Sequence, residues 1–286
     1  MENAIQATGL CKRYGDFALQ NVDITVPAGC ITGFIGENGA GKTTTIKALL
    51  GLIRPDAGTV QVLGMDPFTQ RRQLNRELGA VLDGAFFFEG MRAQDIGSVM
   101  ARLHPLWEQP LFEQYCARFS LPLKKPVKEY SKGMRAKLAL VTALAHRPKL
   151  LVMDEPTSGL DPVVRSEILD LFLEFIEDEQ HSIFLSSHIT SDLEKVADYI
   201  TFLHGGRVVL HGEKDALLET YGVAKCARAD AGALESGPWQ IVGRRESKFD
   251  TELLVAGKNA LRAAHPEVLV EPASLDDIMT FFAKEH

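Results

Sequence analysis

The sequence predicts an α/β fold made of a small β-subdomain, a strand-and-helix core with an inserted helical subdomain, and a C-terminal α+β accessory domain. Short apolar runs that suit buried strands alternate with helical patterns over most of the first 220 residues. Between residues 85 and 147 this alternation stops, and helical patterns interrupted by prolines take its place. We therefore place one domain at residues 1–220, with the helical subdomain at about 85–147, and a second at 221–286.

The composition is that of an ordinary globular protein, with 45% hydrophobic and 24% charged residues. No apolar run approaches the roughly 18 to 20 residues that cross a bilayer, and the first residues lack a signal-peptide pattern, so we expect a soluble chain. Four cysteines without C-x-x-C spacing favour neither a zinc site nor disulfides and fit a reducing cytosol. The net charge of −7 argues against a large nucleic-acid footprint. The basic residues between 124 and 137 are most simply a solvated face.

One glycine-rich stretch organises the chain, because it reads G-x-x-x-x-G-K-[ST]. It consists of Gly36, Glu37, Asn38, Gly39, Ala40, Gly41, Lys42 and Thr43. An apolar run at residues 30–35 predicts a strand before it, and residues 42–50 predict a helix after it that ends at Gly51. Such a loop turns its N–H groups onto a polyphosphate, while the lysine adds a cation and the threonine hydroxyl a ligand for Mg²⁺. This context favours a P-loop NTPase over an ordinary glycine-rich turn.

The strands around this loop are predicted at residues 22–26, 59–63 and 78–82, with a helix over residues 69–77 between the last two. Tyr14 precedes the loop, where it could stack on a purine ring or pack on a half-exposed strand. Both alternatives stay open from the residues alone. Asp83 follows the strand at residues 78–82.

The helical subdomain opens with Phe86, Phe87 and Phe88, which cannot all face one side of an element. At least one is a candidate for exposure, although packing of all three around a bend is equally possible. Its helical patterns are broken at Pro105, Pro110, Pro122 and Pro126. Ser131 and Gly133 come just before a helix predicted at residues 135–146, and they form either a second anion-binding helix start or a simple N-cap.

Two carboxylates end the next predicted strand, at residues 150–155. Asp154 lies at the strand tip, where it can hold Mg²⁺, and Glu155 can act as a base or orient an attacking water. Asp161 is a predicted N-cap followed by Pro162, and the helix runs to about residue 179. A strand at residues 183–187 then ends at His188, and a histidine at a strand end in a βα series lies at the ligand crevice.

The rest of the chain is less informative about chemistry. Residues 200–210 predict a hairpin, and the tail predicts strands near residues 224–226, 253–256 and 268–270. A final helix has a capping box from Ser274 to Asp277 and an apolar stripe of Leu275, Ile278, Met279 and Phe282. No catalytic group is evident there.

Taken in order, these motifs resemble an ATP-binding cassette (ABC) transporter ATPase, over roughly residues 4–220. The variant signature with Lys132 and Met134 and the C-terminal extension are similar to the exporter branch, which handles drugs, lipids or peptides. The resemblance implies that Tyr14 stacks on adenine and that residues 36–44 bind the phosphates of ATP. It further implies catalytic roles for Lys42, Glu155 and His188. Mg²⁺ would be held by Thr43 and Asp154, and Asp83 could also hold the ion or one of its waters. The loop residues that would contact ATP are Gly36, Glu37, Asn38, Gly39, Ala40, Gly41, Lys42, Thr43 and Thr44.

The resemblance also implies partners. Ser131 and Gly133 would complete the site of a second ABC ATPase subunit, identical or paralogous, and Asp161 would link the two sites. An integral membrane permease subunit would hold the chain at the cytoplasmic face of the membrane and select the cargo. Asp83 stands where family members usually carry a glutamine; Asp is shorter and anionic, so the electrostatics near the γ-phosphate differ.

Three alternatives remain. A switch GTPase would need a guanine-reading N-K-x-D, which the chain lacks. A soluble cassette protein acting on the ribosome or nucleic acid usually has two cassettes or a long coiled-coil insertion. A regulatory nucleotide-binding module would be expected to lack Glu155 or His188, and both are present. We therefore expect an ATP-hydrolysing transporter subunit.

Overall fold

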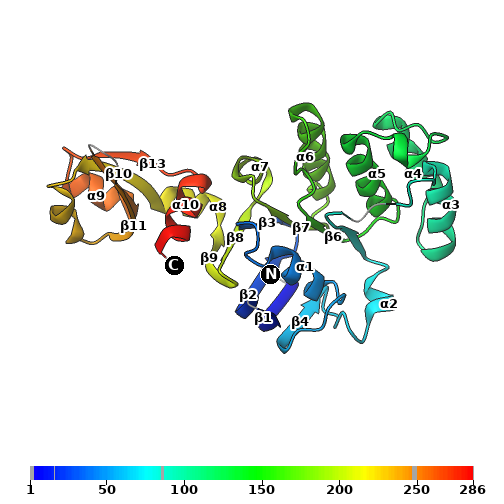
Figure 1. The fold of residues 1–286 in the computed structure, drawn as a ribbon, viewed down its shortest axis with the longest axis horizontal. Helices are drawn as coiled ribbons and strands as arrows, with labels where there is room; N and C mark the ends of the chain where they lie inside the picture. Colours follow the sequence, from blue (N-terminus) through cyan, green and yellow to red (C-terminus); the bar gives the residue numbers. More distant parts are fainter. Residues whose placement is uncertain (1–2, 16, 85–86, 247–249, 286) are drawn as a thin grey trace.

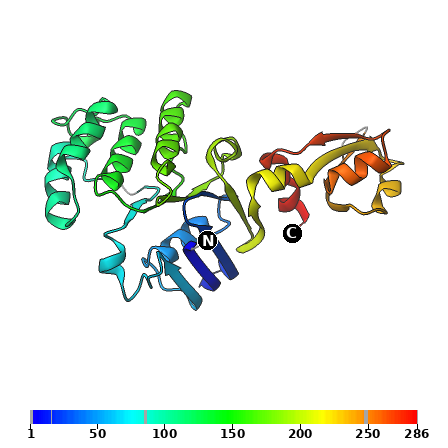
Figure 2. The same ribbon diagram turned by 180° about the vertical axis from the view of Figure 1, so that it is seen from behind.

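The structure is a computed structural model that describes residues 3–15, 17–84, 87–246 and 250–285. Within these residues the strands form three separate sheets (Figure 1). A six-stranded sheet lies at the centre, helices α3 to α5 lie at one end of the long axis, and a four-stranded C-terminal sheet lies at the other (Figures 1 and 2). None of the helices in the described part of the chain is both long and apolar enough to span a bilayer.

The central sheet has the order β5-β6-β7-β3-β8-β9, in which the first five strands are parallel and β9 is antiparallel to β8. Its strands are β3 (Ile31–Gly36), β5 (Leu78–Val81), β6 (Leu150–Asp154), β7 (Ser182–Ser187), β8 (Tyr199–His204) and β9 (Arg207–Glu213). Successive residues of β3 and β6 are all buried, because alternate side chains enter different cores. Leu151 joins the core formed with the helices, whereas Leu150 joins the core formed with the N-terminal sheet.

Two layers cover this sheet. On one face, α1 (Lys42–Leu49) and the antiparallel sheet β2-β1-β4 share a core with Phe34 and Phe184. The three strands are β1 (Asn3–Tyr14), β2 (Phe17–Pro27) and β4 (Ala57–Val62). On the other face, α6 (Pro162–Ile176) and α7 (Thr190–Val196) pack with α5 (Lys132–Leu144) (Figure 1). The predicted α/β arrangement is confirmed.

The helical part contains α2 (Arg71–Leu74), α3 (Ala93–Leu103), α4 (Gln109–Arg118), a 3-10 turn at Val127–Glu129 and α5. The helix predicted at 69–77 is wrong in extent, because Glu77 already bonds to Lys149 N through its carbonyl at 2.8 Å and leads into β5. Pro110 does not break a helix but lies in the first turn of α4, where its missing N–H costs nothing. Phe86 lies outside the described residues, whereas Phe88 is 82% exposed and Phe87 is half-buried.

The predicted start of the helix after the signature motif is also corrected. That helix, α5, begins at Lys132 rather than at residue 135, because the Ser131 hydroxyl accepts a hydrogen bond from Met134 N at 3.2 Å and caps it. Gly133 therefore lies in the first helical turn. By contrast, the predicted cap of α6 is confirmed: Oδ1 of Asp161 accepts from the N–H groups of Val163 (3.1 Å) and Val164 (3.0 Å). The helix ends at Ile176, three residues earlier than predicted.

The C-terminal residues form an antiparallel sheet of order β11-β12-β10-β13. Its elements are α8 (Lys214–Thr220), β10 (Tyr221–Ala227), a 3-10 turn (Ala231–Glu235), β11 (Gln240–Glu246), β12 (Asp250–Ala256), α9 (Lys258–Ala264), β13 (Leu269–Pro272) and α10 (Leu275–Glu285). β11 was not predicted, because this edge strand ends in three charged residues. The capping box at Ser274 is present, and Phe282 packs edge-on against Phe202 of β8, which joins α10 to the central sheet.

Candidate active site

The candidate site lies where three neighbouring strands of the central sheet end. β6, β7 and β3 are adjacent and parallel, so their carboxyl ends meet at one edge of the sheet. Asp154 pairs with Ser186 in the register of β6 and β7, and Ile35 pairs with Ser187 in that of β3 and β7. The glycine-rich loop, the two carboxylates and His188 are thus brought together from distant parts of the chain.

A cavity of about 480 Å³ opens at this edge. Its lining residues are Tyr14, Phe17, Glu37, Asn38, Gly39, Gly41, Lys42, Thr43, Thr44, Asp83 and Glu155. Gly41 has φ of 111°, and a Cβ there would lie 2.5 Å from Leu19 and 2.7 Å from Phe17, so only glycine fits. Gly41 is also the N-cap residue of α1 and supplies no side-chain acceptor to the first turn. The start of this helix therefore offers its N–H groups to an anion.

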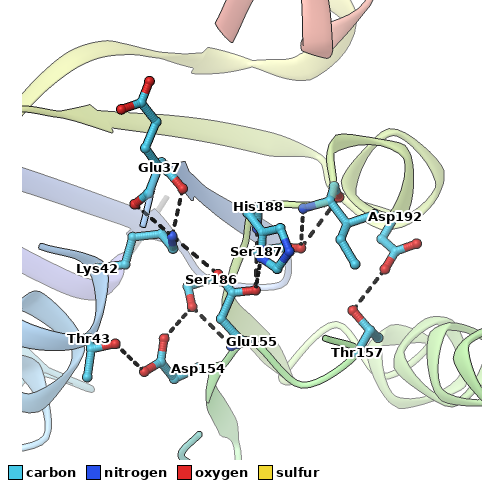
Figure 3. Close-up of polar contacts among 12 residues, drawn as sticks. Glu37, Lys42, Thr43, Asp154, Glu155, Thr157, Ser186, Ser187, His188 and Asp192 are labelled. Atoms are coloured by element: carbon cyan, nitrogen blue, oxygen red, sulfur yellow. Dashed lines mark hydrogen bonds and ion pairs between the residues drawn. The ribbon is translucent and has the colours of Figure 1, made fainter. Parts of the chain in front are cut away.

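Lys42 is the cation of the cavity and is 6% exposed. Its Nζ donates to the carbonyl oxygens of Gly36 at 2.6 Å and Glu37 at 3.2 Å, and it lies 3.2 Å from Oε1 of Glu155 (Figure 3). A buried ammonium needs such partners, because desolvation of an unpaired charge is costly. The same group is well placed to bind the oxygens of a polyphosphate that enters the cavity.

Thr43 and Asp154 present two oxygen atoms side by side. The Thr43 hydroxyl donates to Oδ2 of Asp154 at 2.6 Å, and the Ser186 hydroxyl donates to Oδ1 at 2.5 Å (Figure 3). The described residues contain no group of three or more His, Cys, Asp or Glu side chains that could hold a metal alone. Mg²⁺ is commonly bound by one or two protein oxygens together with substrate phosphates and water, so this pair fits Mg²⁺.

Glu155 links the cavity to the end of β7. Its Oε2 lies 2.7 Å from Nδ1 of His188, and its other oxygen faces Lys42. The backbone of Glu155 has φ of 51°, and its N–H bonds to the carbonyl and hydroxyl oxygens of Ser186. A left-handed backbone is strained for a non-glycine residue. These bonds hold the turn that aims the carboxylate between a lysine and a histidine.

Known proteins are similar to this chain in sequence and in fold. The family profile described as ABC transporter matches residues 19–158. A bacitracin transport ATP-binding protein of Bacillus licheniformis is 34% identical over 212 residues, which cover 73% of this chain and 69% of that protein. A lantibiotic transport ATP-binding protein of Streptococcus pyogenes is 33% identical over 222 residues, 74% of this chain and 91% of that one. The chain belongs to the ABC transporter family.

The solved structures agree with this assignment. The ATP-binding subunit of an ABC transporter is 27% identical and has a TM-score of 0.67, over 76% of this chain and 92% of that subunit. As an ABC ATPase, the chain binds ATP and has the hydrolytic activity that characterises the family. The predicted family and enzyme class are therefore confirmed.

Three predicted residues of this ABC ATPase lie away from the cavity. Ser131 and Asp161 are exposed helix caps, and Gly133 is buried against Val164. They do not line the cavity. Gly36, Ala40, Asp154 and His188 do not line it either, but the last two contact the lining residues Thr43 and Glu155. Tyr14, which is 48% exposed, and Asp83 do line it, beside the glycine-rich loop.

Sequence reasoning missed four side chains at or behind the site of the ABC ATPase. Phe17 lines the cavity, and Ser186 bonds to Asp154. Behind them, the Thr157 hydroxyl donates to Oδ2 of Asp192 at 2.8 Å, and both residues are 1% exposed. The serine pair at the end of an apolar strand was a usable signal for Ser186, whereas Thr157 and Asp192 meet only through the tertiary fold.

Proposed function

We propose that the chain is the ATP-hydrolysing subunit of an exporter that moves a drug, a peptide or a lipid through a separate membrane subunit. The observation that carries the catalytic part is the position of Glu155 between Lys42 and His188, at 3.2 Å and 2.7 Å. The proposal that the chain serves an exporter rests on what several similar proteins are named for. Besides the bacitracin and lantibiotic proteins, a daunorubicin resistance ATP-binding protein of Streptomyces coeruleorubidus is 34% identical, over 76% of this chain and 70% of that protein.

The reaction is transfer of the γ-phosphoryl group of ATP to water. Lys42 and the N–H groups of residues 36–44 bind the phosphates and offset the negative charge that develops there. Glu155 accepts a hydrogen bond from the attacking water and draws its proton away, and His188 contacts the γ-phosphate. Thr43 and Asp154 would hold Mg²⁺, with Asp83 nearby, and the ion would supply charge neutralisation on the phosphates.

Tyr14 is the proposed adenine contact. Its ring lines the cavity next to the glycine-rich loop and is about half exposed, which leaves a face open for stacking. Nζ of Lys12 lies 5.5 Å from the centre of the ring and pairs with Asp56 at 2.7 Å, so one side of the ring is bordered by an ion pair.

Two copies of the cassette, or this chain and a paralogue, are proposed to close around ATP. Ser131 and Asp161 are exposed and lie outside their own cavity. They are thus available to a second subunit, which Ser131 and Gly133 would approach with the N-terminal end of α5. ATP would favour the closed pair by binding it more tightly than the open one.

The proposed membrane partner is a permease, and the proposed location of the chain is the cytoplasmic face of the membrane. Cargo selectivity would then belong to the permease. A soluble cassette protein of the ribosome or of nucleic acid is the less favoured candidate, and the net charge of −7 gives it no support.

The experiment that tests this function is affinity capture of tagged Glu155→Gln from detergent-solubilised cells in the presence of ATP. We expect mass spectrometry to identify an integral membrane subunit at near-equal amount. Recovery of ribosomal proteins or nucleic acid without a membrane subunit would overturn the exporter assignment. The wild-type chain captured without nucleotide is the control for contacts that do not depend on ATP.

A further inference from the structure

The segments that follow β6 and β7 contact each other at two places. The first connection is the contact of Glu155 with His188 at the cavity. The second lies two residues after Glu155 and four residues after His188, where the Thr157 hydroxyl donates to Oδ2 of Asp192 at 2.8 Å (Figure 3). Both Thr157 and Asp192 are 1% exposed, whereas the His188 side chain is 42% exposed. The inner connection is therefore shielded from solvent and the outer one is open to it.

The Asp192 carboxylate has few partners that could replace the Thr157 hydroxyl. Besides Thr157, the carboxylate of Asp192 faces the Nε atom of Arg165 in α6, at 3.8 Å. That atom is buried and donates no hydrogen bond within the part of the chain that the structure describes. Without the Thr157 hydroxyl, the carboxylate would keep only this distant cation, and a buried charge that loses a hydrogen bond is strongly destabilised. We expect α7 then to shift toward Arg165.

A shift of α7 would move His188, because little chain separates them. The Ser187 hydroxyl accepts from Ile189 N at 2.9 Å, and Asp192 N bonds to the Ile189 carbonyl at 3.2 Å, so residues 187–192 form one hydrogen-bonded turn. The next residue, Leu193, packs on Gly33 of β3, where an added Cβ would lie 2.9 Å from its side chain. Along the chain, Asp192 therefore lies between His188 and a residue that packs on β3, the strand that leads into the glycine-rich loop.

We propose that Thr157 and Asp192 are positioning residues of the ATPase site, which hold His188 against Glu155. This proposal rests on the proposed hydrolytic roles of those two residues. Neither Thr157 nor Asp192 lines the cavity, so they act on the reaction through the loop that carries His188. Placement errors of about 1 Å can cost on the order of a hundredfold in rate, which makes such a hydrogen bond consequential.

The test is a double-mutant cycle between Thr157→Val and His188→Ala, with Thr157→Ser as the matched control that keeps the hydroxyl. We expect Thr157→Val to lower kcat at least about tenfold with KM for ATP within about twofold, and Thr157→Ser to stay within about threefold. In the His188→Ala background, Thr157→Val should cost less than about twofold more, because the residue it positions is gone. Unchanged kcat in Thr157→Val, or an equal loss in both backgrounds, would overturn the proposal.

A second readout does not depend on ATP hydrolysis. Hydrogen–deuterium exchange should rise in Thr190–Val196 in Thr157→Val and stay at the wild-type level in Thr157→Ser, while exchange in Lys42–Leu49 is unchanged. Equal exchange in both variants would also overturn the proposal. If Thr157→Val does not fold, Thr157→Ala replaces it in both measurements, because alanine removes the hydroxyl without placing a γ-methyl group beside the carboxylate. If the wild-type protein hydrolyses ATP no faster than Glu155→Gln does, the proposed function is refuted. The positioning role is then still tested by the exchange measurement, which does not depend on hydrolysis.

Discussion

Nδ1 of His188 lies 2.7 Å from Oε2 of Glu155, across the ends of the neighbouring strands β7 and β6. The Nε2 atom of the same ring makes no hydrogen bond to the described residues and remains free for another partner. Since the other carboxylate oxygen faces Lys42, Glu155 connects the phosphate-loop cation to the histidine. Substitution of any of these three residues should therefore change the rate of ATP hydrolysis.

Replacement of Glu155 by glutamine should separate binding from hydrolysis. The amide keeps the size of the side chain but cannot take a proton from water, so turnover should fall at least about a hundredfold while ATP affinity is retained. Release of phosphate and binding of a fluorescent ATP analogue measure the two. Glu177→Gln, at an exposed glutamate just after α6, is the control. Near-normal turnover in Glu155→Gln would refute the assigned base.

Lys42→Ala should weaken nucleotide binding. The change removes a buried ammonium whose hydrogen bonds to charged oxygens are typically worth about 1.5 to 3 kcal/mol, which corresponds to about ten- to a hundredfold in affinity. Lys47→Ala, on the exposed side of the same helix, should leave affinity unchanged. Equilibrium titration with ATP compares the two variants. Equal affinities would show that Lys42 serves only to neutralise Glu155.

Asp83→Gln should retain ATP binding and alter hydrolysis. Asp83 lines the cavity as an exposed carboxylate, so the change removes a negative charge near the bound phosphates and lengthens the side chain. This prediction is tested by measuring steady-state turnover and nucleotide affinity for Asp83→Gln and the wild type. If both are the same as in the wild type within error, this position has no electrostatic part in the reaction.

Ser131→Arg should prevent pairing of cassettes without preventing ATP binding. Ser131 is exposed and lies outside its own cavity, and loss of its cap on α5 costs only about 1 kcal/mol. In the Glu155→Gln background, light scattering with ATP should report monomers. Ser274→Ala removes the cap of α10 instead and should leave the pair intact. A stable ATP-dependent pair in Ser131→Arg would place the interface elsewhere.

His146 should make the fold sensitive to acid. Burial is the main cause that lowers the pKa of His146 from 6.5 to about 4, and the neighbouring ring of His104, 4.0 Å away, adds to it. Because the unfolded chain takes up this proton first, stability is present above pH 6.5 and is lost as the pH falls toward 4. The loss from this residue between pH 7 and pH 5 should be about 2 kcal/mol.

Urea unfolding at the two pH values measures this loss. His146→Gln can keep a hydrogen bond to the carbonyl of Leu78, which the His146 ring approaches at 3.2 Å, but does not titrate. We expect the variant to lose less stability on acidification than the wild type does. The same loss in both proteins would assign the acid sensitivity to other groups.

Much of the fold and of the site could be read from sequence because the relevant signals are local. Apolar runs predicted the central strands, and caps such as Asp161 and Ser274 predicted where helices begin. The local signals failed where tertiary contacts decide. The helix at 69–77 is cut short by the pairing of Glu77 with the segment that leads into β6, and the charged strand β11 is recruited by its neighbour β12.

The sequence alone predicted which residues are candidates for phosphate binding and acid–base chemistry, since the glycine-rich loop and the strand tips are contiguous segments with their own backbone geometry. Only the tertiary structure decided that β7 lies between β6 and β3, and thus that His188 reaches Glu155. The same strand order brings Thr157 to Asp192, 35 residues away in the chain. Periodicity and capping act within a few residues, whereas strand order depends on how all the apolar faces of the chain are buried together.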